Sequence, residues 1–149
     1  MKKRLVQDWM RTDVVTINPE LRVERVWELM ERERIRHLPV IDNGALVGIV
    51  TERDLKRTVF PTTPPFPRWQ GGKPQSTGSP GDLPVSTIMT TDVHTVKPTD
   101  TILQAVLRML THKIRCLPVI DAVNTLIGII TDTDLLKALA FLLQKETPP

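Results

Sequence analysis

Two stretches of the chain repeat each other. Residues 35–55, which read IRHLPVIDNGALVGIVTERDL, return as residues 114–135, which read IRCLPVIDAVNTLIGIITDTDL. The match begins earlier, at Met10 and Met89, and keeps one offset until an extra turn residue enters the second copy. One copy of this size would bury too small a fraction of its surface to be stable alone, so we expect the two copies to pack together around a pseudo-twofold axis.

Each copy predicts the same order of elements: an extended segment, a helix, two strands joined by a turn, and a closing helix. The extended segments are β-branched and end just before a proline, where helix is disfavoured. The next helices carry apolar residues three and four positions apart, and Trp27 is expected in the core. The pattern indicates an α/β (α+β) fold of two β-α-β-β-α motifs packed through their sheets. The extended segments are 13–17 and 92–96, the strands are 38–41, 46–50, 117–120 and 126–130, and the closing helices begin at Thr51 and Thr131.

Along the chain, the prediction is a first motif at 1–60, a linker at 61–84 and a second motif with a C-terminal helix at 85–149. The linker is rich in proline, which removes backbone donors, and in glycine, which adds chain entropy. This composition favours an exposed connection without regular structure. The alternative is a segment that folds back over the surface, with Phe66 and Trp69 as apolar anchors.

Composition narrows the classes of function. The 149 residues include 20 basic and 17 acidic side chains, spread along the chain rather than clustered as in a nucleic-acid-binding surface, so nucleic acid is not expected as a partner. The single cysteine, Cys116, excludes an intrachain disulfide, and His94 and His112 stand in no metal-ligand spacing. No apolar stretch approaches the roughly 20 residues of a membrane span. We therefore expect a cytoplasmic protein without a metal or a membrane partner.

The C-terminal helix is apolar over more of its circumference than one core face requires, from Leu135 through Leu143. This surplus favours a helix–helix contact in a homodimer. The alternative is that the helix covers the linker or the N-terminus, and helical periodicity does not distinguish the two.

A Thr-x-x-Asp motif stands where each second strand meets the closing helix, at residues 51–54 and 131–134. One interpretation is structural, because threonine at the N-cap and a carboxylate three residues later form a capping box that contributes on the order of 1 kcal/mol. The other is functional, because a helix N-terminus attracts anions, and Asp54 or Asp134 could accept two hydrogen bonds from a vicinal diol such as a ribose. Because Thr-x-x-Asp occurs twice, each time downstream of the same Arg-x-Leu-Pro-Val-Ile-Asp sequence, it is more specific evidence of a binding site than a single copy would be.

An arginine precedes the first strand of each hairpin, as Arg36 and Arg115. A planar guanidinium suits phosphate, but a cation is equally favoured there by the C-terminal end of the preceding helix. His37 either adds a phosphate contact or packs its ring, and its counterpart Cys116 carries no positive charge.

Features of a catalytic site are absent from the sequence. It contains no nucleophile beside a base, no glycine loop for phosphate, no paired catalytic carboxylates and no cluster of metal ligands. The protein is therefore predicted not to be an enzyme, and no cofactor is expected to be required.

Three repeated motifs resemble those of the tandem cystathionine-β-synthase (CBS) domain pair. The resemblance covers nearly the whole chain outside the linker and the termini. It implies two clefts between the repeats, which in many relatives bind adenine nucleotides or S-adenosylmethionine, and flat homodimers for members without a catalytic or transport domain. The motifs are Met-x-Thr-Asp-Val at 10–14 and 89–93, Arg-x-Leu-Pro-Val-Ile-Asp at 36–42 and 115–121, and Gly-Ile-(Val/Ile)-Thr-x-x-Asp-Leu at 48–55 and 128–135.

The resemblance also implies a role for each matching residue. Asp54 and Asp134 would hold ribose hydroxyls, with Thr51 and Thr131 against the ribose or the phosphate. A site can mix residues of both repeats, so that Asp54 would work with Arg115. Segments around Thr16 and Thr95 would meet the adenine, Arg36, His37 and Arg115 would face phosphates, and Pro39 and Pro118 would help to wall the base pocket.

The chain departs from the family pattern in its long linker, in Cys116 and in Asp132, an acidic residue near one expected phosphate path. Cys116 and Asp132 would weaken polyphosphate binding and favour a mononucleotide. The differences of His37 from Cys116 and of Arg53 from Thr133 predict two unequal sites.

The leading hypothesis is a regulatory sensor that binds AMP, ADP, ATP or S-adenosylmethionine and passes the bound state to a regulated protein through its dimer geometry. The alternative is a non-catalytic interaction or scaffold module with vestigial clefts, in which Thr51 and Asp54 only cap a helix.

Overall fold

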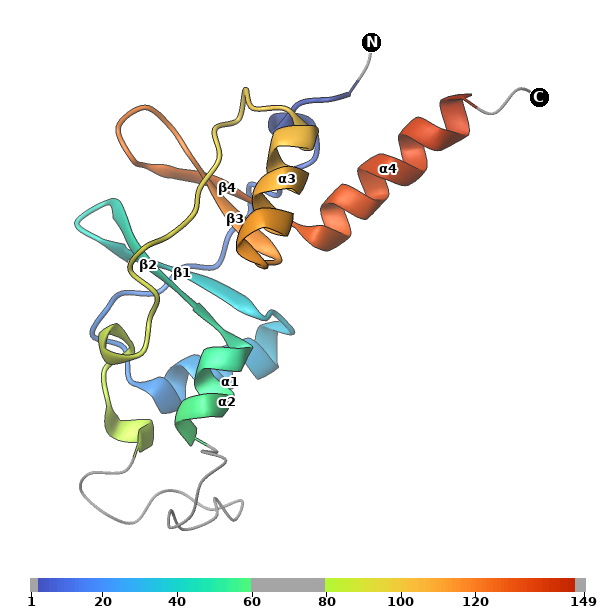
Figure 1. Cartoon of the computed structure of the whole chain (residues 1–149). Coiled ribbons are helices and arrows are strands. Elements are labelled where there is room, and N and C mark those ends of the chain that lie inside the picture. The colour runs from blue at the N-terminus through green and yellow to red at the C-terminus, as the bar shows by residue number, and fades with distance from the viewer. Residues whose placement is uncertain (1–2, 60–79, 147–149) are drawn as a thin grey trace. The chain divides into compact units, whose positions relative to one another are not determined.

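The structure is a computed structural model that describes residues 3–59 and 80–146. Most of the predicted linker, with Phe66 and Trp69, lies outside these residues. The chain divides into two compact units (Figure 1). Residues 15–93 form one, which we call the first-repeat unit, and residues 1–14 with 94–149 form the other, the second-repeat unit. Each unit therefore combines the helices and hairpin of one repeat with the segment that leads into the other repeat.

The first-repeat unit contains a two-stranded antiparallel sheet and two helices. Helix α1 follows the extended Arg22 and stops at Arg34, whose left-handed φ of 53° ends the helix. Val23, Val26 and Met30 are buried, as the sequence predicts, whereas Trp27, expected in the core, is only partly buried. The elements are α1 (Val23–Glu33), β1 (His37–Asp42), β2 (Ala45–Thr51) and α2 (Glu52–Val59), followed by the 3-10 turns η2 (Pro80–Asp82) and η3 (Val85–Thr87).

The second-repeat unit has the same helix–hairpin–helix order. Its first helix begins with a capping box, in which Thr101 Oγ1 accepts from the Gln104 amide and the Gln104 side chain accepts from the Thr101 amide. The predicted α/β class is confirmed in both units. The elements are the 3-10 turn η1 (Val6–Asp8), α3 (Ile102–His112), β3 (Cys116–Ile120), β4 (Leu126–Thr131) and α4 (Asp132–Glu146).

Turn chemistry fixes the register of the first hairpin. Asn43 and Gly44 have φ values of 50° and 80°. Two consecutive left-handed residues form the type I′ turn whose twist matches that of the flanking strands, and Asn-Gly is its preferred sequence. The resulting register brings His37 opposite Thr51 at the other end of the hairpin.

The first strand of each predicted β-α-β-β-α motif is shorter than expected. Ile17 makes one parallel bridge, to Val40, and Val96 makes the equivalent bridge to Val119. In each case a proline two residues further on has no N–H to donate, so the ladder stops after a single bridge. These segments are extended, as predicted, but they are not strands.

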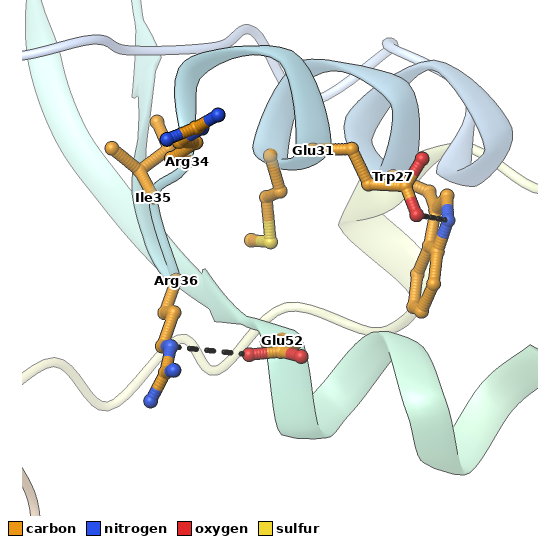
Figure 2. Close-up of a pocket in the computed structure, with 7 residues that line it drawn as sticks. Trp27, Glu31, Arg34, Ile35, Arg36 and Glu52 are labelled. Carbon is orange, nitrogen blue, oxygen red and sulfur yellow. Dashed lines mark hydrogen bonds and ion pairs between the residues drawn. The ribbon is translucent and has the colours of Figure 1, made fainter.

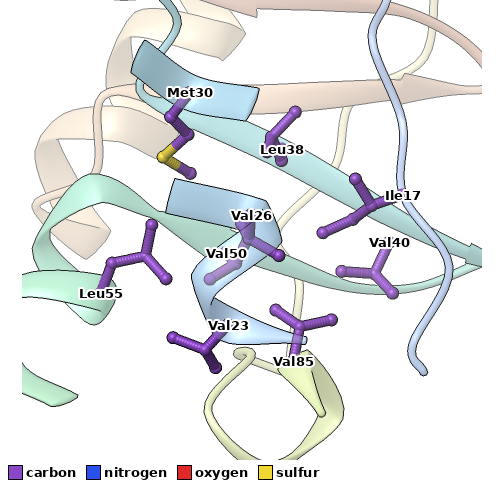
Figure 3. Close-up of a cluster of buried hydrophobic side chains, with 9 residues drawn as sticks. All are labelled: Ile17, Val23, Val26, Met30, Leu38, Val40, Val50, Leu55 and Val85. Carbon is purple, nitrogen blue, oxygen red and sulfur yellow. The ribbon is translucent and has the colours of Figure 1, made fainter. Parts of the chain in front are cut away.

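Each unit has its own hydrophobic cluster. In the first-repeat unit, Val85 lies in the cluster (Figure 3), and its amide donates to the Leu21 carbonyl over 2.7 Å. The segment leading into the second repeat therefore completes the core of the first, and Val6 has the same part in the other unit. The first cluster is Ile17, Val23, Val26, Met30, Leu38, Val40, Val50, Leu55 and Val85, with Trp27 packed against it, and the second is Val6, Val96, Ala105, Met109, Leu117, Val119, Ile130 and Leu135.

The apolar surplus of α4 divides between two surfaces. The ring of Phe141 meets that of Trp9 edge to face, with centroids 5.5 Å apart. On this surface the alternative prediction, that the helix covers the N-terminus, is confirmed. Three leucines stay exposed on α4 and three on the neighbouring α3. They are Leu136, Leu139 and Leu143, and Leu103, Leu107 and Leu110.

Candidate functional site

The first Thr-x-x-Asp motif forms the junction of β2 with α2. The Thr51 amide donates to Asp54 Oδ2 over 2.9 Å, and the Asp54 amide donates to Thr51 Oγ1 over 3.2 Å. This reciprocal pair is a capping box, so the structural interpretation of the motif is confirmed. The capping box engages only one of the two carboxylate oxygens of Asp54, Oδ2. The other, Oδ1, has no polar partner among the residues that the structure describes.

At the junction of β4 with α4, the carboxylate is more fully engaged. Asp134 is buried, with 3% of its surface exposed. Its Oδ2 accepts from the Thr131 amide over 2.9 Å and from the Thr131 hydroxyl over 3.0 Å. Its Oδ1 lies 3.5 Å from Nε of Arg11. A buried carboxylate needs such partners, and here both of its oxygens have them.

The hairpins place one further predicted residue beside each junction. Strand pairing sets His37, which is half-buried, opposite Thr51, and sets Cys116 opposite Thr131. Burial raises the pKa of the Cys116 thiol far above its ordinary value, and neighbouring carboxylates add to the rise. The thiol therefore stays protonated and neutral where the first repeat has an imidazole.

Arg36 belongs to a group of charges at the start of α2. Its Nε lies 3.6 Å from Oε2 of Glu52 (Figure 2), and Oε1 of Glu52 lies 2.8 Å from Nζ of Lys56. The hydrogen bond from Lys56 lowers the pKa of Glu52, and the charge of Arg36 acts in the same direction. The arginine predicted to meet phosphate is thus paired with a carboxylate that offsets its charge.

Arg115 has the same backbone role as Arg36. Its carbonyl accepts from the Asp132 amide over 3.0 Å, as the Arg36 carbonyl accepts from the Glu52 amide over 2.9 Å. The side chain of Arg115 is exposed and has no ion-pair partner within residues 3–59 and 80–146. Both junctions therefore combine one arginine with one acidic residue in the first turn of the helix.

A pocket of about 260 Å³ lies between the end of α1 and the start of α2 (Figure 2). Two acidic and two basic side chains line it, and Nε1 of Trp27 donates to Glu31 over 2.9 Å. Of the predicted site residues it includes only Arg36, and it contains neither aspartate of the repeated motif. The lining residues are Trp27, Met30, Glu31, Arg34, Ile35, Arg36 and Glu52.

The remaining predicted residues lie within the same two units. Thr16 is exposed, while Thr95 is half-buried and its carbonyl accepts a short hydrogen bond from Nη1 of Arg108 on α3. Pro39 and Pro118 are buried in β1 and β3. The first-repeat unit holds Thr16, Arg36, His37, Pro39, Thr51 and Asp54, and the second-repeat unit holds Thr95, Arg115, Pro118, Thr131 and Asp134.

Sequence reasoning missed two charged residues beside the junctions. Arg11 stands where the second copy has Thr90, and this mismatch in an otherwise matching segment was its only signal. Glu52 is the counterpart of Asp132, so the acidic residue is a shared feature and not a departure of one copy.

No group of three or more metal-ligating side chains occurs in the part of the chain that the structure describes, and no helix there is long and apolar enough to cross a membrane.

The model of a family described as CBS domain matches residues 6–60 and 85–141 of this chain. The chain belongs to the CBS domain family. The two matched ranges correspond to the two sequence repeats, so the predicted resemblance is confirmed.

Relatives of this chain include proteins of its own size and larger enzymes. It is 32% identical over 130 residues to the CBS domain-containing protein YhcV of Bacillus subtilis, covering 87% of this chain and 81% of YhcV. It is 31% identical to the CBS domain-containing protein DDB_G0289609 of Dictyostelium discoideum, covering 98% of each. It is 35% identical to homoserine O-acetyltransferase of Methanococcoides burtonii over 87% of this chain, which spans 23% of that enzyme.

Solved structures of CBS proteins share the fold. The CBS-domain containing protein ATU1752 from Agrobacterium tumefaciens superposes with a TM-score of 0.75 and 28% identity over 92% of this chain and 94% of its own. Protein MJ1225 from Methanocaldococcus jannaschii superposes with a TM-score of 0.77 and 30% sequence identity, over 93% of this chain and 48% of its own. The CBS domain pair of protein MJ0100 was solved in complex with 5′-methylthioadenosine and S-adenosyl-L-methionine. It superposes with a TM-score of 0.73 and 22% sequence identity, over 96% of this chain and 98% of its own.

Proposed function

We propose that this chain is a regulatory module that binds an adenosine-containing ligand, AMP, ADP, ATP or S-adenosylmethionine, at its strand–helix junctions. The observation that carries the proposal is the Asp54 carboxylate. Its capping box holds one oxygen in place and leaves Oδ1 without a polar partner among the described residues. A carboxylate held in this way is a preorganised acceptor for the hydroxyls of a ribose.

The charges around the junctions favour a ligand with few phosphates. Arg36 is paired with Glu52, and Arg115 is adjacent to Asp132. The carboxylate paired with Arg36 offsets its charge, and an acidic residue in the first turn of the helix follows each arginine, so a second or third phosphate would be repelled. A nucleoside, a mononucleotide or S-adenosylmethionine fits this balance better than a triphosphate.

The ligand class is supported by one structural relative. The CBS domain pair of MJ0100 binds 5′-methylthioadenosine and S-adenosyl-L-methionine, and both carry a ribose diol. A module of this kind regulates by preferring one conformation when the ligand is bound, so the regulated protein would read a change in shape and not a chemical product.

Ligand-dependent thermal stability tests the proposal. At about 100 times its dissociation constant a ligand adds roughly 2.7 kcal/mol, which raises the Tm of a chain of this length by roughly 5–10 °C. Asp54→Asn keeps an oxygen for the Thr51 amide but removes the charge that accepts the diol. In an Asp134→Asn background, where only this junction keeps its carboxylate, we expect Asp54→Asn to lower affinity at least tenfold, measured by calorimetry, with little change in the Tm of the ligand-free protein.

The matched control is Asp42→Asn, which removes an exposed carboxylate from the same hairpin. It should leave affinity unchanged. Failure of AMP, ADP, ATP and S-adenosylmethionine to raise the Tm at millimolar concentration would contradict the proposal and favour the alternative, a scaffold module in which the capping box is purely structural.

We also propose that the chain forms a homodimer through α3 and α4. Six exposed leucines lie on these two neighbouring helices, and an apolar surface of this kind is uncommon on a monomer. Leu139→Glu is expected to weaken dimerisation at least tenfold in sedimentation velocity, because a charge would be buried in the contact. Lys137→Glu, on the exposed polar surface of the same helix, should leave the dimer intact, and a wild-type monomer at all concentrations would refute the proposal.

A further inference from the structure

Arg11 and Thr90 occupy equivalent positions in the two units. Arg11 exchanges two backbone hydrogen bonds with Ile129 of β4, each 2.9 Å long. Thr90 exchanges the same two bonds with Ile49 of β2, over 2.9 and 3.0 Å. The backbone is therefore the same at both positions, and only the side chain differs.

That difference reaches the repeated aspartates. Nε of Arg11 lies 3.5 Å from Oδ1 of Asp134, while Thr131 already engages Oδ2. Thr90 carries no charge and provides no equivalent cation, and Oδ1 of Asp54 has no polar partner among the described residues. Asp134 is thus matched by a charge from its own chain, whereas Asp54 has no such match within residues 3–59 and 80–146.

We propose that Arg11 is a built-in competitor for the Asp134 carboxylate, so that a ribose diol binds preferentially at Asp54. This inference rests on the proposed function, since it concerns which of the two junctions accepts the ligand. A diol approaching Asp134 must first displace the guanidinium from Oδ1, because both carboxylate oxygens are already engaged. At Asp54 no charged side chain of the described residues has to be displaced from Oδ1.

The size of the preference follows from the exposure of the pair. The side chain of Arg11 is 54% exposed and that of Asp134 is 5% exposed, so solvent screens the cation more than the carboxylate. Pairs with an exposed partner are weak, and we expect a difference of about fivefold in affinity between the two junctions.

The test measures adenosine binding to variants that isolate one junction. Adenosine carries the diol but no charge, so loss of the arginine cannot act through attraction of a phosphate. In an Asp54→Asn background only the Asp134 junction retains its carboxylate. Arg11→Thr, which copies Thr90, is expected to tighten adenosine binding about fivefold in this background, measured by calorimetry.

Two controls separate competition from a general effect on the fold. Arg11→Thr should leave affinity unchanged in an Asp134→Asn background, and binding of 2′-deoxyadenosine should gain less than that of adenosine. Arg11→Gln, which keeps a long polar side chain but no charge, should behave like Arg11→Thr if charge is the cause. Circular dichroism identifies any variant that fails to fold.

The outcomes distinguish this inference from the proposed function. If wild type binds adenosine but Arg11→Thr leaves or weakens the affinity of the Asp54→Asn protein, competition by Arg11 is refuted and the proposed function stands. If neither wild type nor any Arg11 variant binds adenosine, AMP, ADP, ATP or S-adenosylmethionine, the proposed function fails and this inference fails with it.

Discussion

Cys116 in the native protein is expected to react with a thiol reagent such as DTNB on the order of a thousandfold more slowly than in the unfolded chain. The side chain is buried in β3. Burial, with the neighbouring carboxylates of Asp134 and Asp132, raises the pKa of the thiol far above its ordinary value. Thiolate is the reactive form, so both access and chemistry oppose the reaction until β3 opens.

The measurement compares the rate of DTNB labelling at pH 8 in native buffer and in concentrated guanidinium chloride. Val123→Cys in a Cys116→Ala background is the matched control, because Val123 is exposed in the turn between β3 and β4. This control should react at nearly the same rate in both conditions. Native Cys116 labelled within tenfold of the unfolded rate would contradict the structure around this strand.

Local patterns in the sequence predicted most of the fold. The helical spacing of apolar residues located α1 and α3, and Asn43-Gly44 located the first hairpin turn through its requirement for two left-handed residues. Each of these patterns involves residues close together in the sequence and specifies the structure of those same residues. A single sequence was therefore enough to predict them. The exception is the first strand of each motif, where a proline two residues on reduced an expected strand to one bridge.

Contacts between distant segments were beyond this kind of reasoning. Val6 packs with α3 and Val85 with α1, so each unit is completed by a segment that the sequence repeat assigns to the other copy. A repeat shows which segments are alike, but not which copy of a segment packs against which sheet. Arg11 follows the same logic, because its partner Asp134 is far along the chain and only the fold joins them.

The repeated aspartates show a further limit. The sequence offered two interpretations of Thr-x-x-Asp, a helix cap and an acceptor of a diol, and the capping box is confirmed. The two interpretations do not compete for the same atom, because at Asp54 the cap uses Oδ2 and leaves Oδ1. A pattern of residue types cannot assign the two oxygens of one carboxylate to different roles, whereas coordinates can.

Gly128→Ala is expected to lower the free energy of unfolding by about 2–3 kcal/mol, because it would force apart two segments that now lie in contact. A Cβ at this position would stand 2.8 Å from Sδ of Met10 and 2.9 Å from the carbonyl oxygen of Arg11. The methionine side chain can move, but the carbonyl is part of the backbone pair between Arg11 and Ile129. Relief of the contact therefore requires the N-terminal segment to leave β4.

Gly48→Ala is the matched control from the other repeat. Its Cβ would meet Sδ of Met89 at 2.6 Å, which is the far end of a flexible side chain, and the Thr90 carbonyl at 3.1 Å, which is a milder contact. We expect a loss of less than about 1.5 kcal/mol there, measured by urea denaturation of both variants. An equal or larger loss for Gly48→Ala would contradict the close approach at Gly128. Because displacement of the segment also removes the guanidinium of Arg11 from Asp134, a folded Gly128→Ala protein should bind adenosine at that junction as tightly as Arg11→Thr does.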